Sequence, residues 1–137
     1  MTHTLYLVDP DPTERRRLQS VLAAEADVVA AFESIETFLA QASEMEGECL
    51  VVSAALPEPE LLALIESLQR RPAALPVIVL DRDTELRTAV NLMRAGAADF
   101  IEPGFGDRQL LAVVHQLFPR QTDFNPNSFI PSKSTRT

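Results

Sequence analysis

Four polar side chains stand at the ends of short apolar runs, and they are the residues of this 137-residue chain best placed to do chemistry together. They are Asp9, Ser53, Asp81 and Glu102. Apolar runs without polar alternation are typical of strands that are covered on both faces of a parallel sheet. Ligand sites in such sheets lie at the carboxyl ends of the strands, so we expect Asp9 and Asp81 to lie near Ser53.

Two interpretations are open for this group. Neighbouring carboxylates repel each other and attract cations, so Asp9 and Asp81 could form a weak divalent-metal site. The interpretation that we favour is that each carboxylate is solvated or hydrogen-bonded to loop amides, because strand-end acids often have polar partners. Ser53 is not expected to be a nucleophile, because no Gly-x-Ser-x-Gly turn surrounds it and no His is implied near it. The first apolar run is not followed by a glycine-rich phosphate loop, which argues against a nucleotide- or flavin-binding enzyme.

Strands and helices that would position these residues alternate along the chain. The apolar runs predict strands at residues 5–8, 28–32, 49–53, 76–80 and 98–101. Helices are expected to start after Asp11, after Ser34, near Glu58, near Thr84 and after Asp107. The first start is the clearest, because an Asp cap is followed by Pro at the first helical position and Glu at the third. This alternation predicts one α/β domain with a doubly wound, mostly parallel sheet and helices on both faces.

Apolar spacing also predicts which helix faces are buried. In the helix from about residue 84 to 95, the residues expected to face inward are Leu86, Ala89, Val90 and Met93. The same spacing places Leu39 inward on the helix after Ser34. The simplest interpretation of the run Arg15, Arg16 and Arg17 is a solvated helix face. The alternative is that this run contacts an acidic partner. Cys49 lies within a predicted core strand, so a buried structural thiol is expected.

Composition limits the classes of function. The net charge is -8, and residues 1–118 alone carry nineteen acidic residues against nine Arg and no Lys, which gives -10. Such an acidic body repels phosphate backbones and argues against direct nucleic-acid binding. We expect no membrane span and no secretory signal, so a cytoplasmic protein is indicated. Residues 119–137 are rich in Pro, Ser and Thr, carry a net charge of +2 and read as a flexible tail or linker that could lead to an output domain.

Four stretches carry a family resemblance. They are Leu7–Asp11, Leu50–Pro57, Pro76–Leu80 and Met93–Pro103, of which the run Ala-Gly-Ala-x-Asp-Phe-Ile is the most specific. Through them, residues 4–118 resemble the receiver domain of two-component response regulators, particularly those fused to helix-turn-helix output domains. The resemblance implies a flavodoxin-like five-stranded parallel sheet of order 2-1-3-4-5 with five helices. It also implies a signalling role without enzymatic activity, and we expect neither a cofactor nor a bound metal.

The resemblance breaks at the positions that carry the family's chemistry. In that family an Asp at the end of the third strand accepts phosphate, two acids after the first strand hold magnesium, and a Thr or Ser and a Lys bind the phosphoryl group. Here Ser53 stands at the phosphoacceptor position and Pro10 replaces the second acid after Asp9. Asp81 stands at the hydroxyl position, and Pro103 at the lysine position. Phosphoryl transfer depends on these charges, so the resemblance implies an inactive pocket, as in a pseudo-receiver.

The implied function is therefore a phosphorylation-independent interaction module that regulates transcription through a fused or partner output domain. Relatives commonly pair through the face formed by the helix from 84, the strand 98–101 and the helix after 107. Here that face carries a mixture of charges suited to pairing of two copies. The residues are Arg87, Arg94, Asp99, Glu102 and Arg108.

Two further readings are kept open. Phe100 matches the fifth-strand aromatic that changes orientation on activation in the family, and with Asp81 in place of the coupling hydroxyl we expect it to be held in one state. Phe100 could instead be ordinary partly buried packing. The alternative function is a ligand- or metal-sensing domain that uses the altered pocket at Asp9, Ser53 and Asp81.

Overall fold

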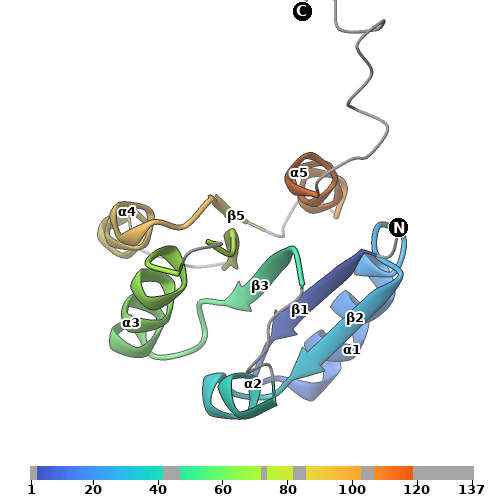
Figure 1. The fold of residues 1–137 in the computed structure, drawn as a ribbon, viewed down its shortest axis with the longest axis horizontal. Helices are drawn as coiled ribbons and strands as arrows, with labels where there is room; N and C mark the ends of the chain where they lie inside the picture. The colour runs from blue at the N-terminus through green and yellow to red at the C-terminus, as the bar shows by residue number, and fades with distance from the viewer. Residues whose placement is uncertain (1–2, 42–46, 72–73, 82–85, 103–106, 119–137) are drawn as a thin grey trace, which may run out of the picture.

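The computed structural model of the chain describes residues 3–41, 47–71, 74–81, 86–102 and 107–118, in which strands and helices alternate (Figure 1). The strands are β1 (Thr4–Val8), β2 (Val28–Phe32), β3 (Cys49–Ser53), β4 (Val77–Leu80) and β5 (Asp99–Ile101). The helices are α1 (Pro12–Leu22), α2 (Ile35–Gln41), α3 (Glu58–Gln69), α4 (Leu86–Ala95) and α5 (Arg108–Leu117). The five expected strands and five expected helices are thus confirmed, with boundaries that differ by a residue or two.

The strands form one parallel sheet in the order β2-β1-β3-β4-β5, which confirms the predicted order. Val8 at the end of β1 pairs with Val52, and Ser53 at the end of β3 pairs with Leu80. The carboxyl ends of β1, β3 and β4 therefore meet at one edge of the sheet. This register is what brings the residues after these strands together.

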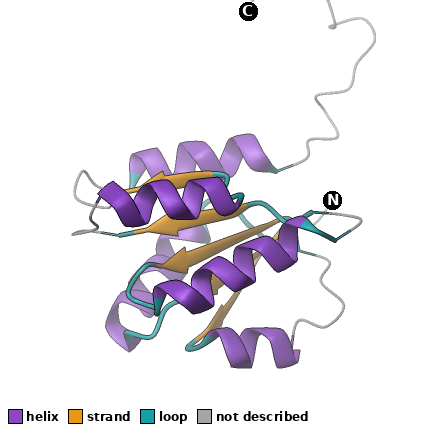
Figure 2. Ribbon diagram, turned by 90° about the vertical axis from the view of Figure 1, so that its left-hand side faces the viewer, coloured by secondary structure: helices purple, strands orange, loops and turns teal. Residues whose placement is uncertain are grey.

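Helices cover both faces of the sheet (Figure 2). On one face, α2, α3 and α4 pack through a cluster that includes Phe38 and Leu92. On the other face, α1 and α5 pack through a second cluster that includes Leu18 and Val114. Each such side chain stabilises the fold by about 1.5–3 kcal/mol when fully buried. Cys49 is buried in the second cluster, which confirms the expected structural thiol, and burial raises the pKa of that thiol to about 12.

Two predicted helix caps are confirmed. The Asp11 side chain accepts a hydrogen bond from the Thr13 backbone N–H at 3.0 Å, with Pro12 at the first turn of α1. Ser34 Oγ accepts from the Thr37 N–H at 3.0 Å at the start of α2. These caps satisfy backbone donors that a helix start otherwise leaves unpaired, and they fix where each helix leaves its loop.

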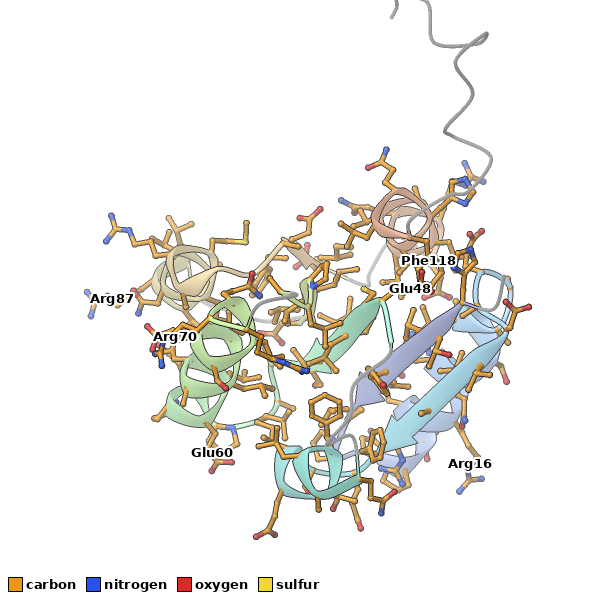
Figure 3. All side chains as sticks on the ribbon, in the orientation of Figure 1. Arg16, Glu48, Glu60, Arg70, Arg87 and Phe118 are labelled. Atoms are coloured by element: carbon orange, nitrogen blue, oxygen red, sulfur yellow. The ribbon has the colours of Figure 1, made fainter. Side chains whose placement is uncertain are left out.

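Other local predictions are wrong. The Asp107 side chain makes no capping hydrogen bond at the start of α5 and instead binds Arg17 of α1. Arg17 therefore belongs to a partly buried ion pair, whereas Arg16 remains exposed as expected and points away from the body (Figure 3). Leu39 of α2 is 46% exposed rather than buried, because the sheet ends at β2 and offers little cover beyond it.

The buried face of α4 is the opposite of the one that apolar spacing predicts. Leu86 is 80% exposed, Met93 42% and Val90 38%, while Leu92 is the buried residue of the helix. Polar side chains of α4 turn inward and bind Glu58 of α3. The prediction failed because a period of 3.6 residues shows that a helix has an apolar face but not the direction in which that face points.

The two ends of the described chain meet at the amino edge of the sheet. The ring of His3, just before β1, stacks on Phe118, just after α5, with ring centroids 4.6 Å apart and planes 5° apart. His3 Nδ1 also lies 2.8 Å from Glu48 Oε1, and Figure 3 shows Glu48 and Phe118 close together. The predicted tail or linker, residues 119–137, lies outside the described residues.

Candidate functional site

A cavity of about 300 Å³ opens where β1, β3 and β4 end. Its lining residues are Asp9, Asp11, Thr13, Glu14, Leu18, Ser53, Ala55, Leu80 and Asp81. Asp9, Ser53 and Asp81 therefore share one cavity, as the topology predicted. Glu102 and Pro10 are exposed and are not among the lining residues, and Pro103 lies outside the described residues.

Asp9 is the most buried charged residue of this cavity, with 3% of its surface exposed. Its Oδ1 accepts a hydrogen bond from the Asp11 backbone N–H at 2.9 Å, which is the loop-amide contact that we favoured. Burial raises the pKa of the Asp9 carboxyl, and the nearby Glu14 and Asp11 carboxylates raise it further. The Asp11 amide and the Arg15 guanidinium lower this pKa but do not offset the burial.

Neighbouring polar groups of the cavity are bound to their own loops. Ser53 Oγ accepts a hydrogen bond from the Ala55 N–H at 3.1 Å and so shapes the turn after β3. Arg15 approaches the site, but its Nη1 donates to the backbone carbonyl of Asp9 at 2.8 Å rather than to a carboxylate. The Ser53 hydroxyl thus has a structural contact, and the lining residues that the structure describes include no His that could activate it.

Among the described residues, four carboxylates line the cavity, those of Asp9, Asp11, Glu14 and Asp81, and no basic side chain is part of this lining. The negative charge of Glu14 is balanced by Arg17, which is not a lining residue: both Glu14 carboxylate oxygens accept hydrogen bonds from Arg17, at 2.8 and 3.0 Å. Within the described ranges, no three His, Cys, Asp or Glu residues are grouped so that they could hold a metal ion. The cavity can therefore repel anions and attract single cations or protons.

Arg17 joins two parts of the chain that sequence reasoning did not connect. Its guanidinium binds Glu14 on its own helix and reaches both carboxylate oxygens of Asp107 at 2.9 and 3.1 Å. These hydrogen bonds, mainly those to Glu14, raise the pKa of Arg17. The three-residue spacing of Glu14 and Arg17 is a signal that could have revealed the first pair. Asp107 is 90 positions away, so no local pattern could reveal the second.

A second surface combines the charged residues that we named for pairing. Arg87 and Arg94 lie on α4, Asp99 on β5, Glu102 directly after β5, and Arg108 on α5. All of them are exposed except Asp99, which is half-buried and accepts a hydrogen bond from the next backbone N–H at 2.7 Å. Figure 3 shows Arg87 pointing away from the body of the domain.

Exposed apolar residues of α4 lie beside these charges. Leu86, Ala89, Val90, Met93 and Arg94 line a surface hollow of about 430 Å³. We call Leu86, Val90 and Met93 the α4 stripe. Phe100 on β5 is partly buried and packs against the core cluster under α2, α3 and α4. Its contacts are those of a packed side chain, and its being held in one state stays a prediction.

Residues 5–115 match the family model of the response regulator receiver domain. The chain belongs to the response regulator receiver family. The receiver fold is also seen in solved structures: the chain superimposes on a response regulator receiver protein from Pseudoalteromonas atlantica with a TM-score of 0.73 and 34% identity, covering 83% of this chain and 95% of that one.

Curated relatives of this receiver domain include a transcriptional regulatory protein and a response regulator protein. It is 29% identical over 114 residues to the transcriptional regulatory protein FixJ of Rhizobium meliloti (strain 1021), covering 83% of this chain and 56% of FixJ. It is 26% identical over 125 residues to the response regulator protein TmoT of Ectopseudomonas mendocina, covering 89% of this chain and 57% of TmoT. The chain thus spans about half the length of these relatives. In the described part of the receiver domain, no helix has the length and hydrophobicity that crossing a bilayer requires.

Proposed function

We propose that this receiver domain is a pseudo-receiver: a phosphorylation-independent module that pairs with a second copy or another protein and regulates transcription through a fused or partner output domain. The observation that carries the proposal is the cavity at the ends of β1, β3 and β4, where Ser53 ends β3 among four carboxylates and no basic side chain belongs to the lining that the structure describes. In this proposal residues 1–118 form the receiver unit and residues 119–137 a tail or linker.

Phosphoryl transfer is disfavoured by both the nucleophile and the charge of this cavity. A phosphoryl group carries negative charge that must be neutralised in the transition state, usually by a metal ion and a cationic side chain. Asp81 adds a carboxylate where the family has a hydroxyl, and Ser53 cannot form the acyl phosphate that an Asp forms. Arg15 is the basic side chain next to Asp9, but it is engaged by a backbone carbonyl.

Pairing through α4, β5 and α5 is supported by complementary charges and by the α4 stripe. Three exposed Arg residues share this face with Asp99 and Glu102, so a two-fold pair can match two Arg residues of one copy with the two carboxylates of the other. The stripe beside them supplies the apolar area that such a contact needs. The proposal includes a cytoplasmic location and no direct contact of this chain with nucleic acid, because its acidic body repels phosphate backbones.

The test is to measure the mass of the protein by sedimentation and light scattering, with and without Mg²⁺ plus an acyl-phosphate donor or beryllofluoride. We expect concentration-dependent pairing that these additives leave unchanged. A Ser53→Asp variant restores only the acceptor carboxylate, and we expect it to remain unlabelled by the donor. Ready labelling of this variant, or an additive-dependent change in mass of the wild type, would contradict phosphorylation independence.

Sensing of a ligand or metal cation is the second candidate function. It is supported by Asp9, a carboxylate with 3% exposure and a raised pKa that lines a cavity with three other carboxylates. A cation bound there would relieve their repulsion. The test is a thermal-unfolding titration with Mg²⁺, Ca²⁺ and Mn²⁺, in which a saturable stabilisation that Asp9→Asn abolishes supports sensing. Equal melting curves at all cation concentrations would exclude sensing of these three metal cations.

A further inference from the structure

Glu58, the first residue of α3, connects this helix to α4 through both oxygens of its carboxylate. Thr88 Oγ1 donates to Glu58 Oε1 at 2.9 Å, and Asn91 Nδ2 donates to Glu58 Oε2 at 3.2 Å. Both contacts are partly buried, where hydrogen bonds to a charged acceptor are stronger than at an exposed site. Thr88 and Asn91 are three positions apart, so they lie on the same side of α4.

The Glu58 contacts and the burial of Leu92 hold the same side of α4 against the domain. On a helix with 3.6 residues per turn, the side opposite Thr88 and Asn91 carries Leu86, Val90 and Met93. With its polar side held against α3, the helix must therefore expose the α4 stripe, and the observed exposures agree. The arrangement leaves three large apolar side chains of α4 exposed, while Leu92 on the inward side is buried in the core.

We infer that Glu58 is a positioning residue: it holds α4 in the rotation that exposes the α4 stripe, so that the surface for a second copy is formed before the copies meet. The identity of the partner rests on the proposed function, whereas the positioning role rests on the Glu58 contacts. The second copy is favoured as the partner because the stripe lies beside Arg87 and Arg94 while Asp99 and Glu102 lie on the adjoining β5 side. One surface thus offers both halves of each charge pair, as self-complementary contacts require.

The first experiment measures α4 directly by amide hydrogen exchange. All variants carry Leu86→Ser, so that pairing does not itself protect the helix. Glu58→Ala removes both hydrogen bonds, and we expect the α4 amides to exchange at least tenfold faster than in the Leu86→Ser parent. Glu58→Gln keeps one acceptor oxygen for Thr88. If the Asn91 side-chain amide flips, its oxygen can accept a hydrogen bond from the new Gln NH₂ group. The α4 amides of this variant should therefore exchange within threefold of the parent rate.

Glu60→Ala is the matched control. It removes the same charge from the same turn of α3, but Glu60 is exposed and points into solvent (Figure 3). We expect its α4 exchange to equal that of the parent. If Glu58→Ala lowers overall folding, Asn91→Asp provides a second route, because it is isosteric and sets a carboxylate against Glu58; it too should accelerate α4 exchange at least tenfold. Unchanged α4 exchange in the folded Glu58→Ala or Asn91→Asp variant would overturn the inference.

The second experiment measures pairing in variants that keep Leu86. We expect Glu58→Ala to weaken the dimer dissociation constant at least tenfold by sedimentation equilibrium, and Glu58→Gln and Glu60→Ala to match the wild type. If the wild-type protein never pairs but the α4 amides still exchange fast in Glu58→Ala, the proposed self-pairing is refuted while the positioning role of Glu58 stands. Normal pairing of Glu58→Ala would overturn the role of Glu58 in forming the surface.

Discussion

Replacing Leu86 with Ser tests the proposed pairing surface most directly. Leu86 is 80% exposed in the isolated domain, so nearly all of its apolar area is available to a partner. Full burial of a Leu side chain stabilises by about 1.5–3 kcal/mol, and 80% of this is about 1.2–2.4 kcal/mol per copy. A two-fold contact contains the residue twice, which gives about 2.4–4.8 kcal/mol per dimer. At about 1.4 kcal/mol for each factor of ten, Leu86→Ser should weaken the dimer by about 50-fold to 2500-fold.

The assay is sedimentation equilibrium over a wide concentration range, with urea unfolding of the same samples. Because the side chain is mostly exposed, the stability of the monomer should change by no more than about 0.5 kcal/mol. Leu39→Ser is the control: it makes the same substitution at a leucine that is 46% exposed on α2, outside the proposed surface. It should leave pairing unchanged.

Two results would refute the reasoning. A folded Leu86→Ser protein that pairs as tightly as the wild type would show that the α4 stripe is not in the interface. Equal weakening by Leu86→Ser and Leu39→Ser would show that general loss of surface hydrophobicity, rather than a specific contact, explains the effect.

Three further predictions concern stability. Burial raises the pKa of Asp9 above its value in the unfolded chain, so the charged carboxylate destabilises the fold at neutral pH. Asp9→Asn should therefore raise the free energy of unfolding at pH 7. This gain should disappear as the pH falls below 3.8, where Asp9 is protonated in both the folded and the unfolded state. A constant gain from pH 7 to pH 3 would contradict this account. Arg17→Met should cost about 1 kcal/mol in urea unfolding at low salt and less at 1 M NaCl, because it frees Asp107, whereas the exposed Arg16→Met should cost almost nothing. An equal loss in both Arg variants would argue against the ion pair. Gly96→Ala should lower the free energy of unfolding by about 1–2 kcal/mol. The backbone φ at Gly96 is +119°, and an added Cβ would lie 2.7 Å from Gln69 Cγ. An unchanged melting curve would contradict this prediction.

Local sequence signals predicted the elements well because their causes are local. The Asp11 cap followed by a Pro is read within four residues, and apolar runs such as Cys49–Val52 specify buried strands without reference to the rest of the chain. The sheet order came from the resemblance of whole motifs, since spacing alone does not order parallel strands. The gathering of Asp9, Ser53 and Asp81 then followed, because parallel strands place their carboxyl ends at one edge.

Predictions failed where the cause lies far along the chain. The rotation of α4 depends on Glu58, which is 30 positions before Thr88, and a single-sequence periodicity cannot register that contact. Asp107 was expected to cap α5 but is drawn to Arg17 by an attraction across 90 positions. Both errors concern polar side chains whose partners are chosen by the tertiary structure, and both lie at places where helices are held against each other.

The stacking of His3 on Phe118 also has a consequence for symmetry. Phe118 is almost fully buried and pinned at the amino edge of the sheet, so any segment that follows it departs from a fixed point at the far end of the domain from the carboxylate cavity. Two copies related by a two-fold axis at α4 would release their following segments from two such points at a constant separation.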